Sequence, residues 1–439
     1  MTQVTAFSIL ALTVSLALRR PRIFSLQIGH APAAVLGAAL CLVTGIVPPH
    51  LAWRTVEFLA VPLATIVSLM VITLVAERAG VFQYMAHRIA RAAAGSAPRL
   101  FTLIFCAGAA TGSVFTNDAA VLIFTPVVFG LIEQTKERDW TLSNKLPFYF
   151  AVLYVSNVVG LFVISNPINI IVSRYFHVSF LEYARWMVLP ALVSIVTSYV
   201  GLRLAFRRDL PRTYKQPEPL VVGSRQRRNM LLCAAVLVPT LVAFFSEEWT
   251  DVPTWIVAAV AAGVLLALHA TVFRGRTGDV VAGVGWDVLI FVVGIFIVAE
   301  GIRHVGLTVY LADLLEAISG DSVLGLTTAT GLTAGAVSAV MNNHPTAGAM
   351  ALTIADMPLE GLTERAVVLS ALIGGDLGPK MLPTGSLAAL MWFRILRDKG
   401  VHVSYWRYVR IGVPVTLAAI VLSVLTLNAE LWLYGWLFP

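Results

Sequence analysis

Charged residues are scarce in this sequence. Asp, Glu, Lys and Arg together make up only 13% of the 439 residues, whereas 58% of the residues are hydrophobic. A typical soluble domain carries about 25% charged residues, so lipid must solvate much of this chain. The composition excludes an ordinary soluble protein and indicates an integral membrane protein.

Cysteine is also scarce, with Cys41, Cys106 and Cys233 scattered along the chain and no CxxC spacing. A disulfide framework, a structural zinc site and a dithiol redox motif are therefore not indicated, and we expect no cofactor. The net charge of +7 would suit nucleic acid, but the basic residues lie in the connections between apolar segments. That placement is a signal of membrane topology, so no nucleic-acid partner is expected.

Long apolar runs, in contrast, are abundant. A helix needs about 20 apolar residues to cross the hydrocarbon core of a bilayer. The pattern predicts an all-α protein with about ten membrane helices, at residues 4–18, 31–48, 57–76, 147–172, 186–205, 230–246, 253–273, 286–302, 365–396 and 409–437. Two further apolar segments, 98–131 and 322–355, are interrupted by polar residues and are predicted to be re-entrant hairpins.

The basic residues predict which side of the membrane each connection occupies. If the loop 206–229 is cytoplasmic, alternation of the spans makes five other connections cytoplasmic, namely 19–30, 77–99, 132–146, 274–285 and 394–410. These segments and their helix ends hold all Lys and Arg residues except Arg54, Arg174, Arg185, Arg303, Arg365 and Lys380. This bias follows the positive-inside rule, so both termini are expected on the outer, non-cytoplasmic side of the membrane.

The chain also contains an internal repeat. The string GVFQYMA at 80–86 matches GLTVYLA at 306–312, and at nearly the same spacing FTND at 115–118 falls on VMNN at 340–343. The predicted helices before these strings run in opposite directions, and inverted repeats are typical of secondary transporters. We therefore expect a first half at 1–205, a basic cytoplasmic linker at 206–229 and a second half at 230–439.

Each half carries two polar interruptions at membrane depth. They lie at 116–118 and 165–167 in the first half, and at 342–345 and 383–386 in the second half. A single interruption of this kind is often only a helix kink, but unpaired backbone in lipid is costly, so non-helical chain must face protein or a water-filled cavity. Four interruptions at repeat-related positions favour a binding site formed between two hairpin tips and two broken helices.

The chemistry of these interruptions narrows the ligand. Asn side chains and free backbone groups offer both hydrogen-bond donors and acceptors. No cluster of Arg or Lys accompanies them, as a phosphate or a dicarboxylate would require. The pattern indicates a small, hydroxyl-rich, largely uncharged solute, or a small cation.

Two acidic residues, Asp118 and Asp376, lie inside predicted membrane elements. A carboxylate there is costly unless it is paired or protonated, so we expect a proton-linked role. For Asp376 a structural ion pair with Lys380, four residues later, is an open alternative. That geometry requires a continuous helix, which Gly378 and Pro379 disfavour.

Four strings in the sequence, FTNDAAVLIFTPVV, SNPINII, MNNHPT and GGDLGPKMLPTGSLAALMW, resemble the ArsB-type arsenite/antimonite efflux permeases, which belong to the ion transporter superfamily. The resemblance covers nearly the whole chain. It implies export of trivalent As(OH)3 and Sb(OH)3 in exchange for protons, and a scaffold with a moving transport domain. The implied partners are arsenite, antimonite, protons, the lipid bilayer, an ArsA-type ATPase and a second copy of the chain.

The resemblance also implies roles for individual residues. The substrate would contact Asn117, Asp118, Asn166, Asn169, Asn342, Asn343, Thr384 and Ser386, and proton coupling would use Asp118, Asp376 and Lys380. Two positions differ from the family pattern, since His344 stands where Met is expected and Thr116 where Ala is expected. No metal site is implied beyond the metalloid substrate itself.

Two other functions remain as alternatives. A sodium- or proton-coupled carboxylate or cation carrier of the same superfamily would share the fold, and sodium dependence would identify it. An intramembrane aspartyl protease would use Asp118 and Asp376. Such enzymes need a GxGD signature, but residues 373–376 of this chain are IGGD, with Ile373 at the position of the first glycine. The transporter interpretation is therefore preferred, and the chain is not expected to be an enzyme.

Overall fold

The computed structural model describes residues 2–23, 26–27, 29–137, 139–155, 159–320 and 322–437, without the side chains of 22–23, 26–27, 117–120, 387 and 435–437. These residues form helices and their connections, apart from one antiparallel pair of two-residue strands, β1 (Arg22–Ile23) and β2 (Leu26–Gln27). The all-α fold class predicted from the sequence is confirmed.

Nine helical segments in the described part of the chain are long and apolar enough to cross a membrane. They are α1 (Thr2–Arg19), α3 (Pro49–Arg78), α5 (Ala97–Val114), α9 (Phe180–Ala205), α10 (Ser224–Phe245), α12 (Thr254–Thr271), α13 (Thr277–Gly283) with α14 (Trp286–His304), α16 (Val323–Met341) and α20 (Tyr405–Leu437). The predicted span 31–48 is only a 14-residue helix, α2 (His30–Val43). It ends early because the chain turns at Gly45, whose φ of +71° does not continue a helix.

The two halves of the chain repeat the same series of elements. In the first half α3 leads into the amphipathic helix α4 (Val81–Ala92), and in the second half α14 leads into α15 (Leu307–Ser319). Both junctions turn at a glycine in the left-handed region, Gly80 with φ +86° and Gly306 with φ +77°. The match between GVFQYMA and GLTVYLA thus marks the same structural junction in both halves.

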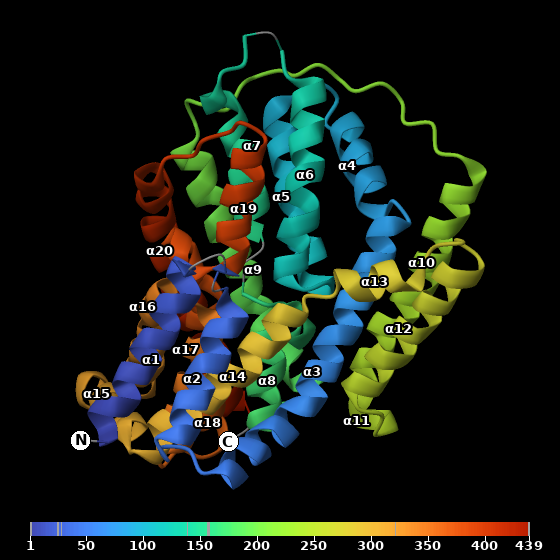
Figure 1. The fold of residues 1–439 in the computed structure, drawn as a ribbon. Helices are drawn as coiled ribbons and strands as arrows, with labels where there is room; N and C mark the ends of the chain where they lie inside the picture. The colour runs from blue at the N-terminus through green and yellow to red at the C-terminus, as the bar shows by residue number, and fades with distance from the viewer. Residues whose placement is uncertain are drawn as a thin grey trace.

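Each half then forms a helical hairpin with a very short connection. Helix α5 is joined to α6 (Asn117–Thr135) by two residues, and α16 is joined to α17 (Asn343–Ala355) by Asn342 alone. Figure 1 shows α5 and α6 in the upper half of the molecule, and α16 and α17 in the lower half. Helix α5 has 18 residues and α16 has 19, so each is long enough to cross a membrane. That the hairpins enter and leave the membrane on one side therefore stays a prediction.

Broken helices follow the hairpins. In the first half α7 (Leu142–Val155) is followed by a short 3-10 turn, η1 (Val163–Ser165), and by α8 (Pro167–Tyr175). In the second half α18 (Gly361–Leu377) is followed by the turns η2 (Gly378–Lys380) and η3 (Pro383–Gly385) and by α19 (Leu387–Asp398). The predicted helices 147–172 and 365–396 are therefore both interrupted where the sequence places Ser165, Pro167 and Pro383.

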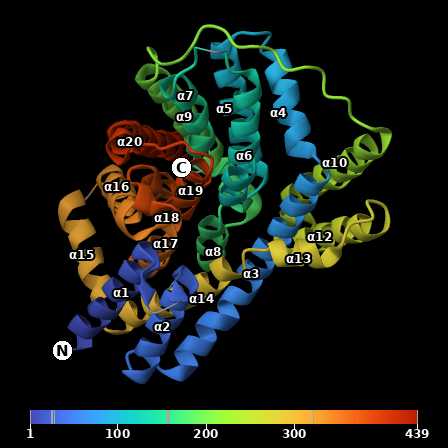
Figure 2. The same ribbon diagram turned by 45° about the horizontal axis from the view of Figure 1, so that its top comes forward.

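The hairpins and broken helices contact one another in the same way in both halves. Helix α5 packs on α7 as α16 packs on α18, and across the molecule α6 packs on α19 as α17 packs on α8. Helices α10 and α12 lie to one side, next to α3 (Figure 2), and the short α11 (Glu247–Thr250) contacts α9 and α10. This pairing of equivalent elements identifies the architecture as the predicted inverted repeat.

Small residues set the distance between α16 and α18. A Cβ atom at Gly374 would overlap the backbone carbonyl oxygen of Gly331 and lie 2.8 Å from the backbone nitrogen of Gly335. Gly331 and Gly335 form a GxxxG spacing, which allows two membrane helices to approach closely. The close seam holds the interrupted helix α18 against hairpin α16–α17.

Candidate functional site

The fully buried carboxylate of Asp376, near the end of α18, joins the two broken helices. Its Oδ1 accepts a hydrogen bond of 2.6 Å from Asn166 Nδ2, and its Oδ2 accepts two bonds of 3.0 Å, from Asn169 Nδ2 and from the Gly160 backbone N–H. Hydrogen bonds to an ionised carboxylate are stronger than neutral ones and compensate for its burial. The three donors all come from the broken helix of the first half, so one acidic side chain ties both halves together.

Asn166 is held in place by the start of α8. Its Oδ1 accepts a bond of 3.2 Å from the Ile168 backbone N–H, as an N-cap does, and Pro167 occupies the first helical position. With the oxygen engaged in the cap, the Nδ2 group points to Asp376. The sequence string SNP therefore encodes both the restart of the helix and the donor to the carboxylate.

Gly160 is a site residue that sequence reasoning missed. Its N–H donates to Asp376, and its carbonyl oxygen accepts a bond of 3.2 Å from the Tyr183 hydroxyl. A Cβ atom at this position would overlap the Ser165 Oγ and lie 2.5 Å from Asn169 Nδ2. A backbone donor has no residue-type signature, and a glycine in an apolar string gave no signal that could have identified it.

Lys380 does not form the ion pair that the sequence suggested. Its fully buried ammonium group makes no ion pair with Asp376 within 4.0 Å, and Nζ lies instead 5.1 Å from the centre of the Tyr154 ring. Within the described residues Nζ has no hydrogen-bond partner. The physical reason is the turn η2, which ends the regular helix at Leu377, so the two side chains are not one α-helical turn apart.

The second hairpin tip holds the second broken helix. Asn342 adopts φ +82° and ψ 158°, and its Nδ2 donates a bond of 3.1 Å to the Gly385 carbonyl oxygen. Ser386, the residue after Gly385, caps α19 by accepting a bond of 3.2 Å from the Ala389 backbone N–H. The tip of α16–α17 and the start of α19 are therefore fixed relative to each other.

His344 completes the tip and is almost fully buried, with 1% exposure. Its Nδ1 lies 3.0 Å from Asn342 Oδ1, and its ring meets Phe291 edge to face at 5.8 Å. Its Nε2 has no hydrogen-bond partner in the described part of the chain. His344 thus orients Asn342 and keeps one ring nitrogen free.

Two predicted site residues have described side chains without hydrogen bonds, and two others have no described side chain. Asn343 is buried and Thr384 partly buried, and neither side chain donates or accepts a hydrogen bond among the described residues. The side chains of Asn117 and Asp118 lie outside the described residues. Only their backbone is placed, at the first two positions of α6.

The helix starts correct the pairing of the two hairpin tips. The sequence match set Asn117 against Asn342 and Asp118 against Asn343, but α6 begins at Asn117 and α17 begins at Asn343. Asn117 therefore corresponds to Asn343, and Asp118 corresponds to His344. The alignment slipped by one residue because FTND and VMNN share an Asn in different positions relative to the helix start.

Comparison with known proteins agrees with this architecture. A family model described as "Arsenical pump membrane protein" matches residues 5–435. The chain is 33% identical to an arsenical pump membrane protein of Escherichia coli over 97% of this chain and 98% of that protein. It is 34% identical to the protein of that name in Yersinia enterocolitica, with the same coverage of both chains.

A solved structure supports the fold. The Alcanivorax borkumensis YdaH transporter, whose topology its crystal structure describes as unusual, superposes with a TM-score of 0.59 at 14% identity. The similarity covers 100% of this chain and 98% of that chain. At this identity the similarity concerns the fold alone.

Proposed function

Because the chain belongs to the arsenical pump membrane protein family, we propose that this multi-pass membrane transporter exports trivalent arsenite and antimonite in exchange for protons. The observation that carries the proposal is Asp376, buried where the two broken helices meet and bound by three N–H donors of the other half. One titratable group at the junction of two repeats is suited to couple proton movement to a change of conformation.

The surrounding groups suit a neutral solute with several hydroxyls, such as As(OH)3. Asn and Ser side chains and the helix ends offer donors and acceptors. The three cysteines lie on separate helices, since Cys41 is in α2, Cys106 in α5 and Cys233 in α10. The site therefore offers no set of thiolates that could chelate arsenic. A site that binds the hydroxyl groups of the substrate by hydrogen bonds can release the substrate again.

Asn169 provides a way for Asp376 to take up a proton without losing its partners. The Asn169 Oδ1 atom is buried and has no hydrogen-bond partner among the described residues, while Nδ2 donates to Asp376. A rotation of the amide by half a turn would present Oδ1 to a protonated carboxyl group, which needs an acceptor. The ionised and the neutral forms of Asp376 can both be satisfied by the same residue.

The other expectations from the sequence complete the proposal. Asp118 would act as a second proton-linked group on the first hairpin, and Asn117, Asn343, Thr384 and Ser386 would contact the substrate. Lys380, the cation next to the second break, would respond to the charge of Asp376 across the break. The chain would reside in the bacterial inner membrane with both termini in the periplasm, act as a homodimer and accept an ArsA-type ATPase as partner.

The test is arsenite accumulation by everted membrane vesicles under an imposed pH gradient, with interior acid. The unmodified chain should accumulate arsenite and antimonite, and collapse of the gradient should release both. An arsenite-sensitive host should also grow on arsenite when it expresses the chain. If the protein is present in the membrane but neither accumulation nor rescue occurs, the proposed function is wrong.

The sodium-coupled alternative predicts a different result in the same vesicles. A sodium gradient without a pH gradient would then drive uptake, and a carboxylate would compete with arsenite. If sodium has no effect, this alternative is rejected.

A further inference from the structure

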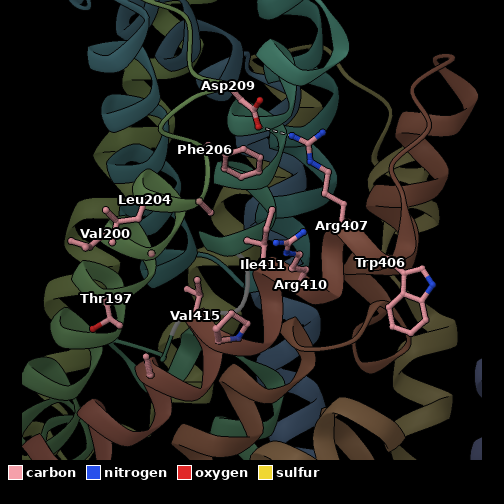
Figure 3. Close-up of a pocket in the computed structure, with 14 residues that line it drawn as sticks. Thr197, Val200, Leu204, Phe206, Asp209, Trp406, Arg407, Arg410, Ile411 and Val415 are labelled. Atoms are coloured by element: carbon pink, nitrogen blue, oxygen red, sulfur yellow. Dashed lines mark hydrogen bonds and ion pairs between the residues drawn. The ribbon is translucent and has the colours of Figure 1, made fainter.

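A groove of about 850 Å³ lies between the end of α9 and the beginning of α20, away from the broken helices. Its walls are apolar and are formed by Val200, Leu204, Ile411, Pro414, Val415 and Ala418. Its lining also includes polar side chains, among them Asp209 from the connection after α9, and Arg407 and Arg410 from α20 (Figure 3). The groove thus combines an apolar channel with a charged opening.

Of the two arginines, only Arg410 lacks a partner. Arg407 donates a bond of 2.6 Å to Asp209 Oδ2, and its guanidinium lies 5.9 Å from the centre of the Phe206 ring. Arg410 is exposed, and it makes no hydrogen bond or ion pair with any residue that the structure describes. The groove therefore presents one uncompensated positive charge next to apolar walls.

The position of the groove matches the level of lipid headgroups. Trp406, in the first turn of α20, is 76% exposed, as expected for a residue of an interfacial aromatic belt. Arg207 and Arg208 are exposed directly after α9. Below them Leu204 is 61% exposed, so the walls face the hydrocarbon region while the charges face the headgroups.

We propose that this groove binds one anionic phospholipid. The phosphate would pair with Arg410, and an acyl chain would lie along the apolar walls of α9 and α20. Basic pockets between membrane helices on the cytoplasmic side bind anionic headgroups, and the positive-inside rule assigns this end of the molecule to the cytoplasm. A free phosphate ion would use the charge but not the walls, and a zwitterionic lipid would leave the net charge of Arg410 uncompensated.

The groove is connected to the candidate site through α20. A Cβ atom at Gly412, two residues after Arg410, would lie only 2.5 Å from the Lys380 carbonyl oxygen. One turn earlier, the buried Tyr408 ring lies 5.5 Å from the Phe393 ring of α19. A lipid in the groove therefore contacts the helix that packs against the break at Lys380, and we expect it to stimulate the transport proposed above.

Binding can be measured by native mass spectrometry of the purified full chain in detergent, titrated with phosphatidylglycerol. We expect Arg410→Ala to weaken phosphatidylglycerol binding about fivefold, the effect of one basic residue at a lipid surface. Arg208→Ala, which removes an exposed arginine outside the groove, should bind like the unmodified chain. Equal affinity of the Arg410→Ala and unmodified chains would overturn the assignment.

A second pair of variants tests the apolar walls. Ala418→Trp should fill the groove and weaken binding with all charges kept, whereas Leu417→Trp, one residue away and not in the lining, should not. Inorganic phosphate should fail to compete with the lipid. Effective competition by phosphate would mean an ion site instead of a lipid site, and loss of a dimer by Ala418→Trp with lipid binding unchanged would assign the groove to a second copy.

Transport separates this inference from the proposed function on which it rests. In phosphatidylcholine vesicles, added phosphatidylglycerol should stimulate arsenite exchange by the unmodified and Arg208→Ala chains, and this stimulation should be lost in Arg410→Ala. Arsenite exchange without any lipid effect would refute the inference alone. Lipid binding without arsenite exchange in any vesicle would refute the proposed function and leave the lipid site standing.

Discussion

At the scale of single residues, the hydrogen bonds of Asp376 explain why a charge can be buried between the two halves. Three N–H donors surround the carboxylate, and each would lose its acceptor if the side chain could no longer accept. An unpaired buried donor costs about 1–3 kcal/mol. Asp376 is thus a structural junction as well as the proposed carrier of the proton.

The substitution Asp376→Asn tests the second role. The amide can accept at one atom only and carries no charge, so we expect arsenite accumulation in everted vesicles to fall at least about 100-fold, which about 3 kcal/mol would produce. Asp313→Asn, on the exposed face of α15, is the control and should transport normally. Normal accumulation by Asp376→Asn, at equal abundance in the membrane, would exclude Asp376 as the proton carrier.

Asn342 is a second residue whose backbone is informative. Its φ of +82° with ψ of 158° lies in a region that only glycine enters readily, at a cost of about 1–3 kcal/mol for other residues. The strain is held by the bonds to Gly385 and His344. Strained backbone of this kind is concentrated at functional sites, which agrees with the position of Asn342 at a hairpin tip.

Two substitutions of Asn342 distinguish the effect of the backbone strain from the effect of losing the side-chain hydrogen bond. Asn342→Ala keeps the strain and loses the bond to Gly385, whereas Asn342→Gly loses the bond but relieves the strain. We expect the glycine variant to be more stable than the alanine variant by about 1–3 kcal/mol, measured by thermal unfolding in detergent. Both should lose arsenite transport, while Asn428→Ala, which removes an amide bonded to Thr327 away from the site, should retain it. Equal stability of the two variants would contradict the assigned strain.

At the scale of elements, the seam between α16 and α18 controls the position of the second break. The helix backbones touch through Gly331, Gly335 and Gly374, with the small side chain of Ala334 beside the contact. Closely packed small residues are a general device of membrane helices, because van der Waals contact replaces the hydrophobic effect as the driving force. The orientation of α18, and so of Asp376, depends on this seam.

Gly374→Ala should therefore destabilise the fold. The added methyl group would overlap the Gly331 carbonyl, and overpacking of this kind costs about 1–3 kcal/mol. The expected result is a lower midpoint of thermal unfolding in detergent. Gly263→Ala is the matched control, since a Cβ there meets no atom within 4 Å and alanine favours a helix. A midpoint unchanged by Gly374→Ala would show that α18 can move away from α16 without cost.

At the scale of the whole molecule, two of the basic connections lie at the same end. In Figure 1 the loop 206–223 and the connection between α19 and α20 lie at the top, while α1 begins and α20 ends at the bottom. From the positive-inside rule we expect the upper end to face the cytoplasm. The two hairpins occupy different halves of this axis, as an inverted repeat requires.

Cysteine labelling tests this orientation. In a chain with its three cysteines replaced by alanine, a membrane-impermeant maleimide should label Val252→Cys from outside intact cells. It should label Arg208→Cys only in everted vesicles, because that position lies in the loop expected in the cytoplasm. Labelling of Arg208→Cys in intact cells would reverse the orientation and, with it, the cytoplasmic assignment of the lipid groove.

The sequence alone determined the class of this protein, its repeat and the positions of its interruptions. Hydropathy is a local property because it follows from residue type. Helix interruptions such as Ser165 to Pro167 are local as well, and they stand out because lipid offers no hydrogen-bond partner to the free backbone groups. The resemblance in GDLGPK and in MNNHPT was also local, and the family to which the chain belongs agrees with it. Helix ends were less accurate, as the short α2 and the one-residue slip between the hairpin tips show.

Only the tertiary structure decided which residues meet. Asp376 and Lys380 are four residues apart in sequence, but the turn η2 separates them, and Asp376 instead binds Asn166, Asn169 and Gly160. The contact with Gly160 uses a backbone N–H, which every residue but proline has. Partners of this kind depend on how distant segments pack, and no local pattern in the sequence records that packing.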